Sequence, residues 1–152
     1  MASGKVLGLA IGPEGAEALS RDAVATASFV EGMGLQGDKK FGRSSGRQVN
    51  LLSKLSYDWF ERNFGRGLSM PGGLGENVVI DGIDPNWLDL GQRIQLGEAI
   101  LQITTPRAPC AGFTERVDGN KVSHFVGHVG VMCAVVQGGT VRVGDTATLL
   151  DE

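Results

Sequence analysis

Glycine places the strongest constraint on how this chain folds, because it occurs 24 times among 152 residues without a fixed period. A typical protein has a glycine share of about 7%, less than half of the share in this chain. Glycine adopts positive φ at no steric cost and is therefore the usual residue of tight turns. Glycines scattered between short apolar runs predict many turns that join short strands.

Short runs of apolar or alternating residues predict strands at residues 5–11, 23–30, 49–52, 77–80, 93–96, 99–105, 129–137, 140–143 and 147–150. In the first run, Leu7, Leu9 and Ile11 alternate and are expected on one face. Gly97-Glu98 is expected to form a hairpin turn, and Gly138-Gly139 is a second turn that tolerates positive φ. Many short strands without a repeat or a linker predict one mostly β domain over residues 1–152, a barrel or a sandwich.

One segment has the spacing of a helix rather than of a strand. It is preceded by Ser53, a residue type that is favoured as a helix N-cap. Either Gly65 or Gly67 can end the helix in a left-handed cap. The apolar positions at helical spacing are Leu52, Leu55, Trp59 and Phe60. We expect the two aromatic residues to pack in the core, and we expect residues 85–88 to form a short helical turn.

Composition indicates a folded protein of the cytoplasm. Hydrophobic residues make up 41% of the chain, yet no apolar run approaches the roughly 20 residues that span a membrane. No long apolar stretch with a cleavage site follows the first residues, so a signal peptide is not expected. Two cysteines do not make a disulfide framework, which suits a reducing compartment. We therefore expect a cytoplasmic protein without a membrane partner.

Positive charge is concentrated in residues 38–47, although the net charge of the chain is −3. This decade has a net charge of +3, from four cations against one acid: Lys39, Lys40, Arg43 and Arg47 against Asp38. A short basic segment in an acidic chain suits a small anionic ligand better than nucleic acid, which is usually bound by a broad basic face. A solvated surface loop would show the same charge pattern.

The segment from Thr104 to Cys110 follows a predicted strand and contains two prolines. Proline fixes φ and favours an extended residue before it, so the strand should end at Pro106 and hold Cys110 in a stiff loop. Arg107 lies three residues before the thiol, and a nearby guanidinium favours the thiolate, which is the nucleophile and the metal ligand. Cys110 is therefore a candidate catalytic residue, although a loop cysteine without a function gives the same pattern.

One pattern imitates a dinucleotide site. Residues 32–37 match G-x-G-x-x-G after a predicted strand, but such a site requires a helix that opens within the motif. Residues 38–42 show no helical periodicity. A glycine-rich turn that presents Lys39 and Lys40 is the better interpretation.

A second pattern imitates a zinc site. The residues that could be proposed as its ligands are His124, His128, Cys110 and Cys133. They include no C-x2-C pair, which zinc sites of this kind normally contain. Cys133 also lies in the apolar run 131–136, where a cysteine is usually a small core residue.

Four stretches, taken together and in this order, resemble one family. They are GLQGDK at residues 34–39, RQVNLLS at 47–53, PGGLGEN at 71–77 and PRAPC at 106–110. The chain resembles the MOSC domain, named for the C-terminal domain of molybdenum cofactor sulfurases, over roughly residues 5–150. Each motif is common by itself, whereas the ordered set is specific.

The resemblance implies a mostly β, barrel-like fold with one main helix and short helical turns. It implies a bound molybdenum cofactor or a sulfur-transfer role, with Cys110 as the molybdenum ligand in cofactor-loaded members. The residues in motifs that line the pterin pocket of related domains are Arg47, Asn77 and Arg107. Lys39 and Lys40 stand where the family usually has an arginine and then a histidine, and we expect both to bind the anionic cofactor.

The resemblance is compatible with three functions. The first, by analogy with related stand-alone members of the family, is a reductase of N-hydroxylated compounds that uses the molybdenum cofactor and a redox partner. The second is a non-enzymatic carrier of sulfur or cofactor, with a persulfide on Cys110 supplied by a sulfurtransferase that itself uses pyridoxal phosphate. The third is a structural descendant whose pocket binds nothing. The sequence leaves this choice open, as it does assembly into a homodimer.

Overall fold

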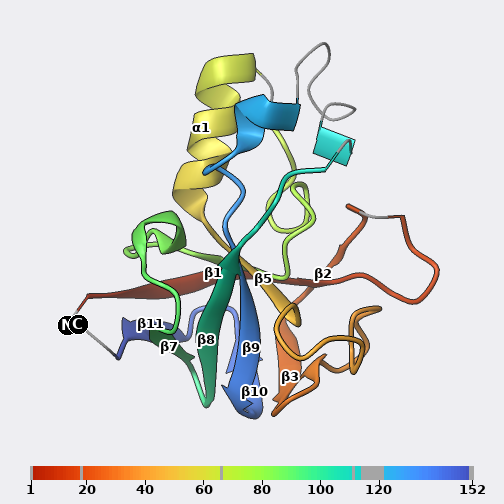
Figure 1. The fold of residues 1–152 in the computed structure, drawn as a ribbon, viewed down its shortest axis with the longest axis vertical. Helices are drawn as coiled ribbons and strands as arrows, with labels where there is room; N and C mark the ends of the chain where they lie inside the picture. Colours follow the sequence, from red (N-terminus) through yellow and green to blue (C-terminus); the bar gives the residue numbers. More distant parts are fainter. Residues whose placement is uncertain (1, 18, 66, 111, 114–121, 151–152) are drawn as a thin grey trace.

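The computed structural model describes residues 2–17, 19–65, 67–110, 112–113 and 122–150. The strands in this part of the chain are β1 (Ser3–Ile11), β2 (Asp22–Val24), β3 (Thr26–Val30), β4 (Gly34–Leu35), β5 (Val49–Ser53), β6 (Val78–Ile80), β7 (Arg93–Leu96), β8 (Ala99–Pro106), β9 (Val131–Gln137), β10 (Gly139–Arg142) and β11 (Thr146–Leu149). The main helix is α1 (Lys54–Phe64), and short 3-10 turns form η1 (Pro85–Trp87) and η2 (Val122–Phe125). The expected mostly β fold with one main helix is confirmed (Figure 1).

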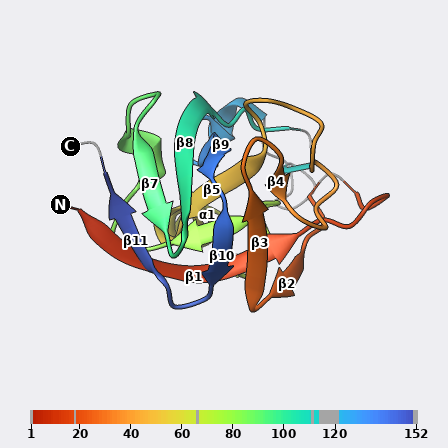
Figure 2. The ribbon, with the colours of Figure 1, turned by 90° about the horizontal axis from the view of Figure 1, so that it is seen from below.

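The strands form a closed barrel. The main sheet has the order β11-β7-β8-β9-β5-β6-β1-β2, and an additional pairing between β11 and β1 closes seven of these strands into a ring. Only β5 and β6 pair in parallel, among the described pairs. Figure 2 shows the molecule from below, with β3, β4 and β10 forming a separate three-stranded sheet at one side. Barrel closure leaves few exposed strand edges.

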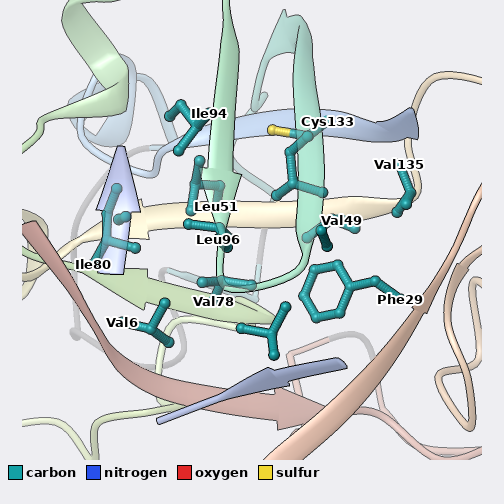
Figure 3. Packing of buried hydrophobic residues seen from close by; sticks show 14 of the residues in the cluster. Val6, Phe29, Val49, Leu51, Val78, Ile80, Ile94, Leu96, Cys133 and Val135 are labelled. Carbon is teal, nitrogen blue, oxygen red and sulfur yellow. The ribbon is translucent and has the colours of Figure 1, made fainter. Parts of the chain in front are cut away.

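Aliphatic side chains fill the barrel interior. Because successive side chains of a strand point to opposite faces, alternate residues of each strand enter the core. Val49 and Leu51 of β5 and Val78 and Ile80 of β6 are all fully buried, and Figure 3 shows them in the packed interior. Burial of one such side chain contributes about 1.5–3 kcal/mol to stability. Cys133 on β9 belongs to the same cluster, which confirms its expected place in the core.

The first strand departs from simple alternation. The pairing of β1 with β6 shifts register between Val6 and Gly8, which is a β-bulge or irregularity. As a result Val6 and Leu9 enter the barrel core, whereas Leu7 packs against the second core cluster below α1. Leu9 and Ile11 therefore pack on the barrel core together as expected, and the expectation is wrong for Leu7. A bulge inserts one residue and moves the following side chains to the opposite face.

Helix α1 closes one end of the barrel. The Ser53 hydroxyl accepts a hydrogen bond from the N–H of Leu55, and Gly65 ends the helix with φ of 65°. Both caps are as predicted. Phe60 packs in the second cluster as expected, and Trp59 lies at its edge. Leu55, however, is 56% exposed, because it faces away from the barrel.

One predicted strand, one predicted turn and one strand end differ in the structure. The run 23–30 divides at Ala25, whose carbonyl accepts from the N–H of Val143, so that β2 stays with β1 while β3 pairs with β10. The turn at Gly138-Gly139 likewise leads β10 to β3 and not back onto β9. Strand β8 includes Pro106, one residue beyond the predicted end. No helix among the described residues has the length and apolarity that crossing a bilayer requires.

Candidate functional site

Three loops converge on a cavity of about 350 Å³ at one side of the barrel. They are the segments between β1 and β2, between β4 and β5, and after β8, which lie on the right in Figure 1. The charged residues that line the cavity are Arg21, Lys40, Arg43, Arg47 and Arg107. No acidic side chain lines it among the described residues. Such a cavity is suited to an anion.

Cys110 lines this cavity from the loop that follows β8. The backbone N–H of Arg107 donates to the carbonyl of Gly130 at 3.1 Å, which holds the loop against the segment before β9. The carbonyl of Cys110 accepts from the N–H of Phe113 at 3.1 Å. The thiol is exposed. A soft, accessible sulfur at the edge of a cationic cavity can act as a nucleophile or bind a soft metal.

Arg107 is buried against the cavity wall without a carboxylate in hydrogen-bond contact, as far as the described residues show. Its Nη1 donates to the carbonyl of Leu74 at 2.9 Å, and its Nη2 lies 3.4 Å from the carbonyl of Gly75. The guanidinium also lies 5.1 Å from the centre of the Phe113 ring. Burial lowers the pKa of Arg107 to about 10, while Glu76 opposes this change. Arg107 is therefore a cation held by uncharged partners.

A glycine is required at residue 75 for this contact. Gly75 has φ of 73°, in the left-handed region that side chains disfavour. A Cβ atom at this position would lie 2.9 Å from Nη2 of Arg107 and 2.6 Å from Cδ2 of Leu19. Only glycine lets the guanidinium approach this carbonyl so closely.

Lys40 is the second cation with an uncharged partner. Its Nζ lines the cavity and donates to Oδ1 of Asn77 at 2.9 Å. Burial lowers the pKa of Lys40 to about 7, although the carboxylate of Asp38 opposes the change. At neutral pH the lysine is therefore close to the midpoint of its titration.

Asn77 supports the cavity from behind and does not line it. Its side chain is fully buried and makes four hydrogen bonds. Oδ1 accepts from Lys40 Nζ and from the backbone N–H of Asn50, and Nδ2 donates to the carbonyl of Ala10 and to Oδ1 of Asp38. The structure therefore gives Asn77 a positioning contact with Lys40 in place of the expected direct contact with a ligand.

Arg47 reaches the cavity from a braced loop. The Ser44 hydroxyl accepts from the backbone N–H of Arg47 at 3.1 Å, and the buried Gln48 donates to the Ser44 carbonyl at 2.9 Å. Arg47 itself is exposed, so its side chain forms the rim. Arg43 lies on the same rim and forms an exposed ion pair with Glu14 at 2.6 Å.

Lys39 does not line the cavity, contrary to the expectation. Its Nζ donates to the carbonyls of Ala16 and Glu17 at 3.1 and 2.7 Å. Its backbone N–H donates to the carbonyl of Gly12. These contacts hold the loop between β1 and β2 in place. Adjacent residues in this turn point in different directions, so only Lys40 enters the cavity.

Arg21 and Asn50 are polar lining residues that the sequence analysis did not recognise. Arg21 comes from the loop before β2, and its side chain is 3% exposed, with Nε 4.0 Å from Oδ1 of Asp38. Asn50 lies within the RQVNLLS motif, and its Nδ2 donates to the carbonyl of Gly75 at 3.0 Å. Its Oδ1 is buried and has no hydrogen-bond partner among the described residues. The motif position was a usable signal for Asn50, whereas no local pattern marked Arg21.

The segments that resemble a dinucleotide site and a zinc site in sequence do not form such sites among the described residues. Residues 32–37 form turns and the short strand β4, and no helix opens there. His128 stacks on Trp59 with ring centroids 3.7 Å apart, on the side of α1. Within the described residues, no three His, Cys, Asp or Glu side chains come close enough together to hold a metal ion.

Comparison with known proteins gives this arrangement a family. A family model described as MOSC domain matches residues 38–148, which include the basic segment, Asn77, Arg107 and Cys110. The chain belongs to the MOSC domain family. It is 27% identical over 139 residues to protein YiiM of Escherichia coli strain K12. That alignment covers 85% of this chain and 62% of YiiM, so the chain spans less than two thirds of this relative.

Solved structures share the MOSC fold. The YuaD protein from Bacillus subtilis superposes with a TM-score of 0.83 at 25% identity, covering 95% of this chain and 94% of that chain. YiiM from Escherichia coli superposes with a TM-score of 0.73 at 21% identity, covering 97% and 70%.

Proposed function

We propose that the cavity binds the molybdenum cofactor through its anionic phosphate, with Cys110 as a ligand of the molybdenum. The observation that carries this proposal is the charge of the cavity wall. Five cationic side chains line it, and two of them, Lys40 and Arg107, have uncharged hydrogen-bond partners among the described residues. A buried cation whose side-chain hydrogen bonds go to uncharged groups gains stability when an anion binds.

The side chains present fit such a ligand. Arg21, Lys40 and Arg107 can donate charge-assisted hydrogen bonds to phosphate oxygens. The free Oδ1 of Asn50 can accept from an N–H group of a pterin once the wall adjusts to the ligand. The exposed thiol of Cys110 is a soft ligand of the kind that molybdenum accepts. Membership of the MOSC family supports the same ligand.

The activity that we propose is reduction of N-hydroxylated compounds. Bound molybdenum supplies two-electron chemistry. The overall change converts N–OH into N–H and water, with two electrons from a redox partner and two protons from solvent. The residues of this chain bind the cofactor, orient it and leave the Cys110 side of the cavity accessible. Related stand-alone MOSC proteins support this choice, and it goes beyond what family membership establishes.

A sulfur carrier is the second candidate, because the Cys110 thiol is exposed and a partner protein can reach it. In this role the thiolate of Cys110 attacks the outer sulfur of a persulfide on a pyridoxal-phosphate-dependent sulfurtransferase. The sulfur–sulfur bond of the donor breaks, its thiolate leaves, and the persulfide is then on Cys110.

Metal and pterin analysis separates these functions. The full chain and the Cys110→Ser variant are purified from a host that makes the molybdenum cofactor. We expect close to one molybdenum and one pterin per wild-type chain, and a loss of molybdenum in the variant. Cyanolysable sulfur without metal, lost in the same variant, would establish the carrier. Neither metal nor sulfur in wild type would contradict both functions.

A further inference from the structure

We propose that Lys40 selects the charge state of the anion that this cavity accepts, by taking up one proton from solvent when a tetrahedral dianion binds. The ligand class is a phosphate monoester. The inference rests on the proposed function for the identity of that ester, which is then the phosphate of the pterin. Its test uses inorganic anions and requires no molybdenum.

The contact that holds the Lys40 ammonium is with an uncharged group. Its Nζ donates to Oδ1 of Asn77 at 2.9 Å, and this oxygen also accepts from the N–H of Asn50 at 3.0 Å. The amide of Asn77 cannot turn over, because its Nδ2 donates to the carbonyl of Ala10 and to Asp38, both at 3.1 Å. An ammonium has three N–H donors, so a side chain placed on the cavity wall can donate to a bound anion as well.

Asp38 is the buried carboxylate beside Lys40, and other donors occupy its oxygens. Oδ1 accepts from the N–H of Gly12 at 2.8 Å and from the amide of Asn77. Oδ2 accepts from the backbone N–H of Lys40 at 3.1 Å, and Oδ1 also lies 4.0 Å from Nε of Arg21. The carboxylate of Asp38 thus bonds the backbone of Lys40, while the ammonium of Lys40 bonds the uncharged amide of Asn77.

Several charged groups act on the lysine from the surrounding elements. They are Asp38, which favours the protonated form, and Arg21, Arg107 and Lys39, which disfavour it. Burial is the largest influence, and together these groups lower the pKa of Lys40 to about 7. Cys133 faces Lys40 from β9, but burial raises the pKa of this thiol to about 12, so it stays uncharged near neutrality.

A bound dianion supplies the missing negative charge and favours the protonated lysine. Binding to the neutral form therefore draws one proton from solvent, and Lys40 gains one positive charge. A monoanion favours this protonation less, because the Coulomb energy scales with the charge. Above the pKa that Lys40 has in the protein without a bound anion, the affinity for a dianion should fall about tenfold for each pH unit.

Isothermal titration calorimetry with sulfate tests this inference, because phosphate groups themselves titrate near neutrality whereas sulfate keeps both charges. All titrations use the Cys110→Ser background, since a thiolate in the cavity would also repel an anion at high pH. Two buffers of different ionisation enthalpy count the protons taken up. We expect almost none per sulfate at about pH 6, close to one at about pH 9, and roughly 100-fold weaker binding at the higher pH.

Variants show which residue takes up the proton when sulfate binds. Lys40→Arg keeps its charge at every pH, so sulfate affinity should be independent of pH without proton uptake. Lys40→Met should bind sulfate weakly at both pH values. Lys54→Met is the control, because Lys54 lies on α1, does not line the cavity and forms an exposed pair with Asp58, and it should keep the pH dependence of the parent. Proton uptake that persists in Lys40→Met, or that disappears in Lys54→Met, would overturn the inference.

The outcomes also separate this inference from the proposed function. Sulfate binding of equal strength at both pH values, without proton uptake, would show that Lys40 does not select the charge state, while the anion site itself would stand. Absence of sulfate binding at both pH values would contradict the anion site, and both proposals would fail together.

Discussion

Two buried charged regions share the segment of residues 71–77, and they satisfy their charges in opposite ways. On one side, the carboxylate of Glu76 accepts from the hydroxyl of Tyr57 at 2.6 Å and from the backbone N–H groups of Gly72 and Leu74 at 2.9 and 3.2 Å. On the other side, the guanidinium of Arg107 contacts carbonyl oxygens, including that of Leu74. The carboxylate of Glu76 therefore accepts three hydrogen bonds from the chain. The guanidinium of Arg107 bonds uncharged carbonyls and can still bind an anionic ligand.

This difference indicates a structural role for Glu76 and a binding role for Arg107. Glu76 is fully buried, and burial together with this carboxylate raises the pKa of Tyr57, so the phenol remains a hydrogen-bond donor. The role of Glu76 is to fix the loop that presents the carbonyls of Leu74 and Gly75 to Arg107. In the proposed function the cationic wall binds the ligand, and a bound anion offsets the cost of its buried positive charge. Removal of each kind of charge should therefore have different consequences.

The largest effect on stability is expected for Glu76→Ala. This substitution leaves two backbone N–H groups without acceptors, at about 1–3 kcal/mol for each buried group, and leaves the hydroxyl of Tyr57 with the longer contact to the Ser69 carbonyl at 3.2 Å. Urea unfolding should show a loss of roughly 3 kcal/mol or more. Glu14→Ala is the control, because Glu14 is an exposed partner of Arg43, and its loss should stay below about 1 kcal/mol. Equal losses in the two variants would remove the contrast.

Arg107→Met should have the largest effect on binding. Methionine keeps much of the buried volume but removes the charge, so sulfate affinity should fall about 100-fold, as is typical for a buried charge-assisted contact. Stability should fall as well, because the carbonyls of Leu74 and Gly75 lose a donor.

Arg47→Ala should weaken binding about tenfold with little change in stability, since Arg47 is exposed. Calorimetry measures both, and unchanged binding in Arg107→Met would contradict the cationic wall.

Lys40→Met should change how stability depends on pH. The pKa of Lys40 is lowered in the folded chain to about 7 from 10.5, so the unfolded state binds more protons between these values and wild-type stability rises with pH there. The increase is at most about 1.4 kcal/mol per pH unit, and it is absent in the variant. Below about pH 7 the variant should be the more stable protein. Parallel stability profiles from urea unfolding at about pH 6 to 9 would contradict this account.

The smallest effect is expected for Arg43→Ala. Arg43 lines the rim of the cavity, but its guanidinium is already paired with Glu14, and both side chains are largely exposed. An exposed pair contributes about 0–1 kcal/mol, and salt screens it. Sulfate affinity should fall by a factor of about three or less, with no change in its pH dependence. A loss as large as that of Arg107→Met would show that rim and wall do not differ.

Much of the fold could be predicted because local patterns decide it. Ser53 and Gly65 end α1 as expected, since capping depends on residue type and nearby backbone. The hairpin at Gly97-Glu98 formed for the same reason. The bulge in β1 could not be predicted, because it depends on how β1 pairs with β6 far along the chain.

The candidate site could be predicted in part. Arg107, Cys110, Arg47 and Lys40 line one cavity, although they come from motifs that are far apart in the sequence. The neighbours Lys39 and Lys40 could not be told apart, because the turn after Asp38 decides which of them enters the cavity. Arg21 was missed because its loop carries no motif and it reaches Asp38 only in the folded chain.

The central claim is that the cationic wall of the cavity binds a tetrahedral dianion. Tungstate tests it most directly, because this dianion has the shape of phosphate and its anomalous scattering locates it in a crystal without ambiguity. We predict the strongest anomalous peak within hydrogen-bond distance of Lys40 and Arg107, and its loss in Arg107→Met crystals grown in the same way. A strongest peak elsewhere, with none in the cavity, would contradict the account.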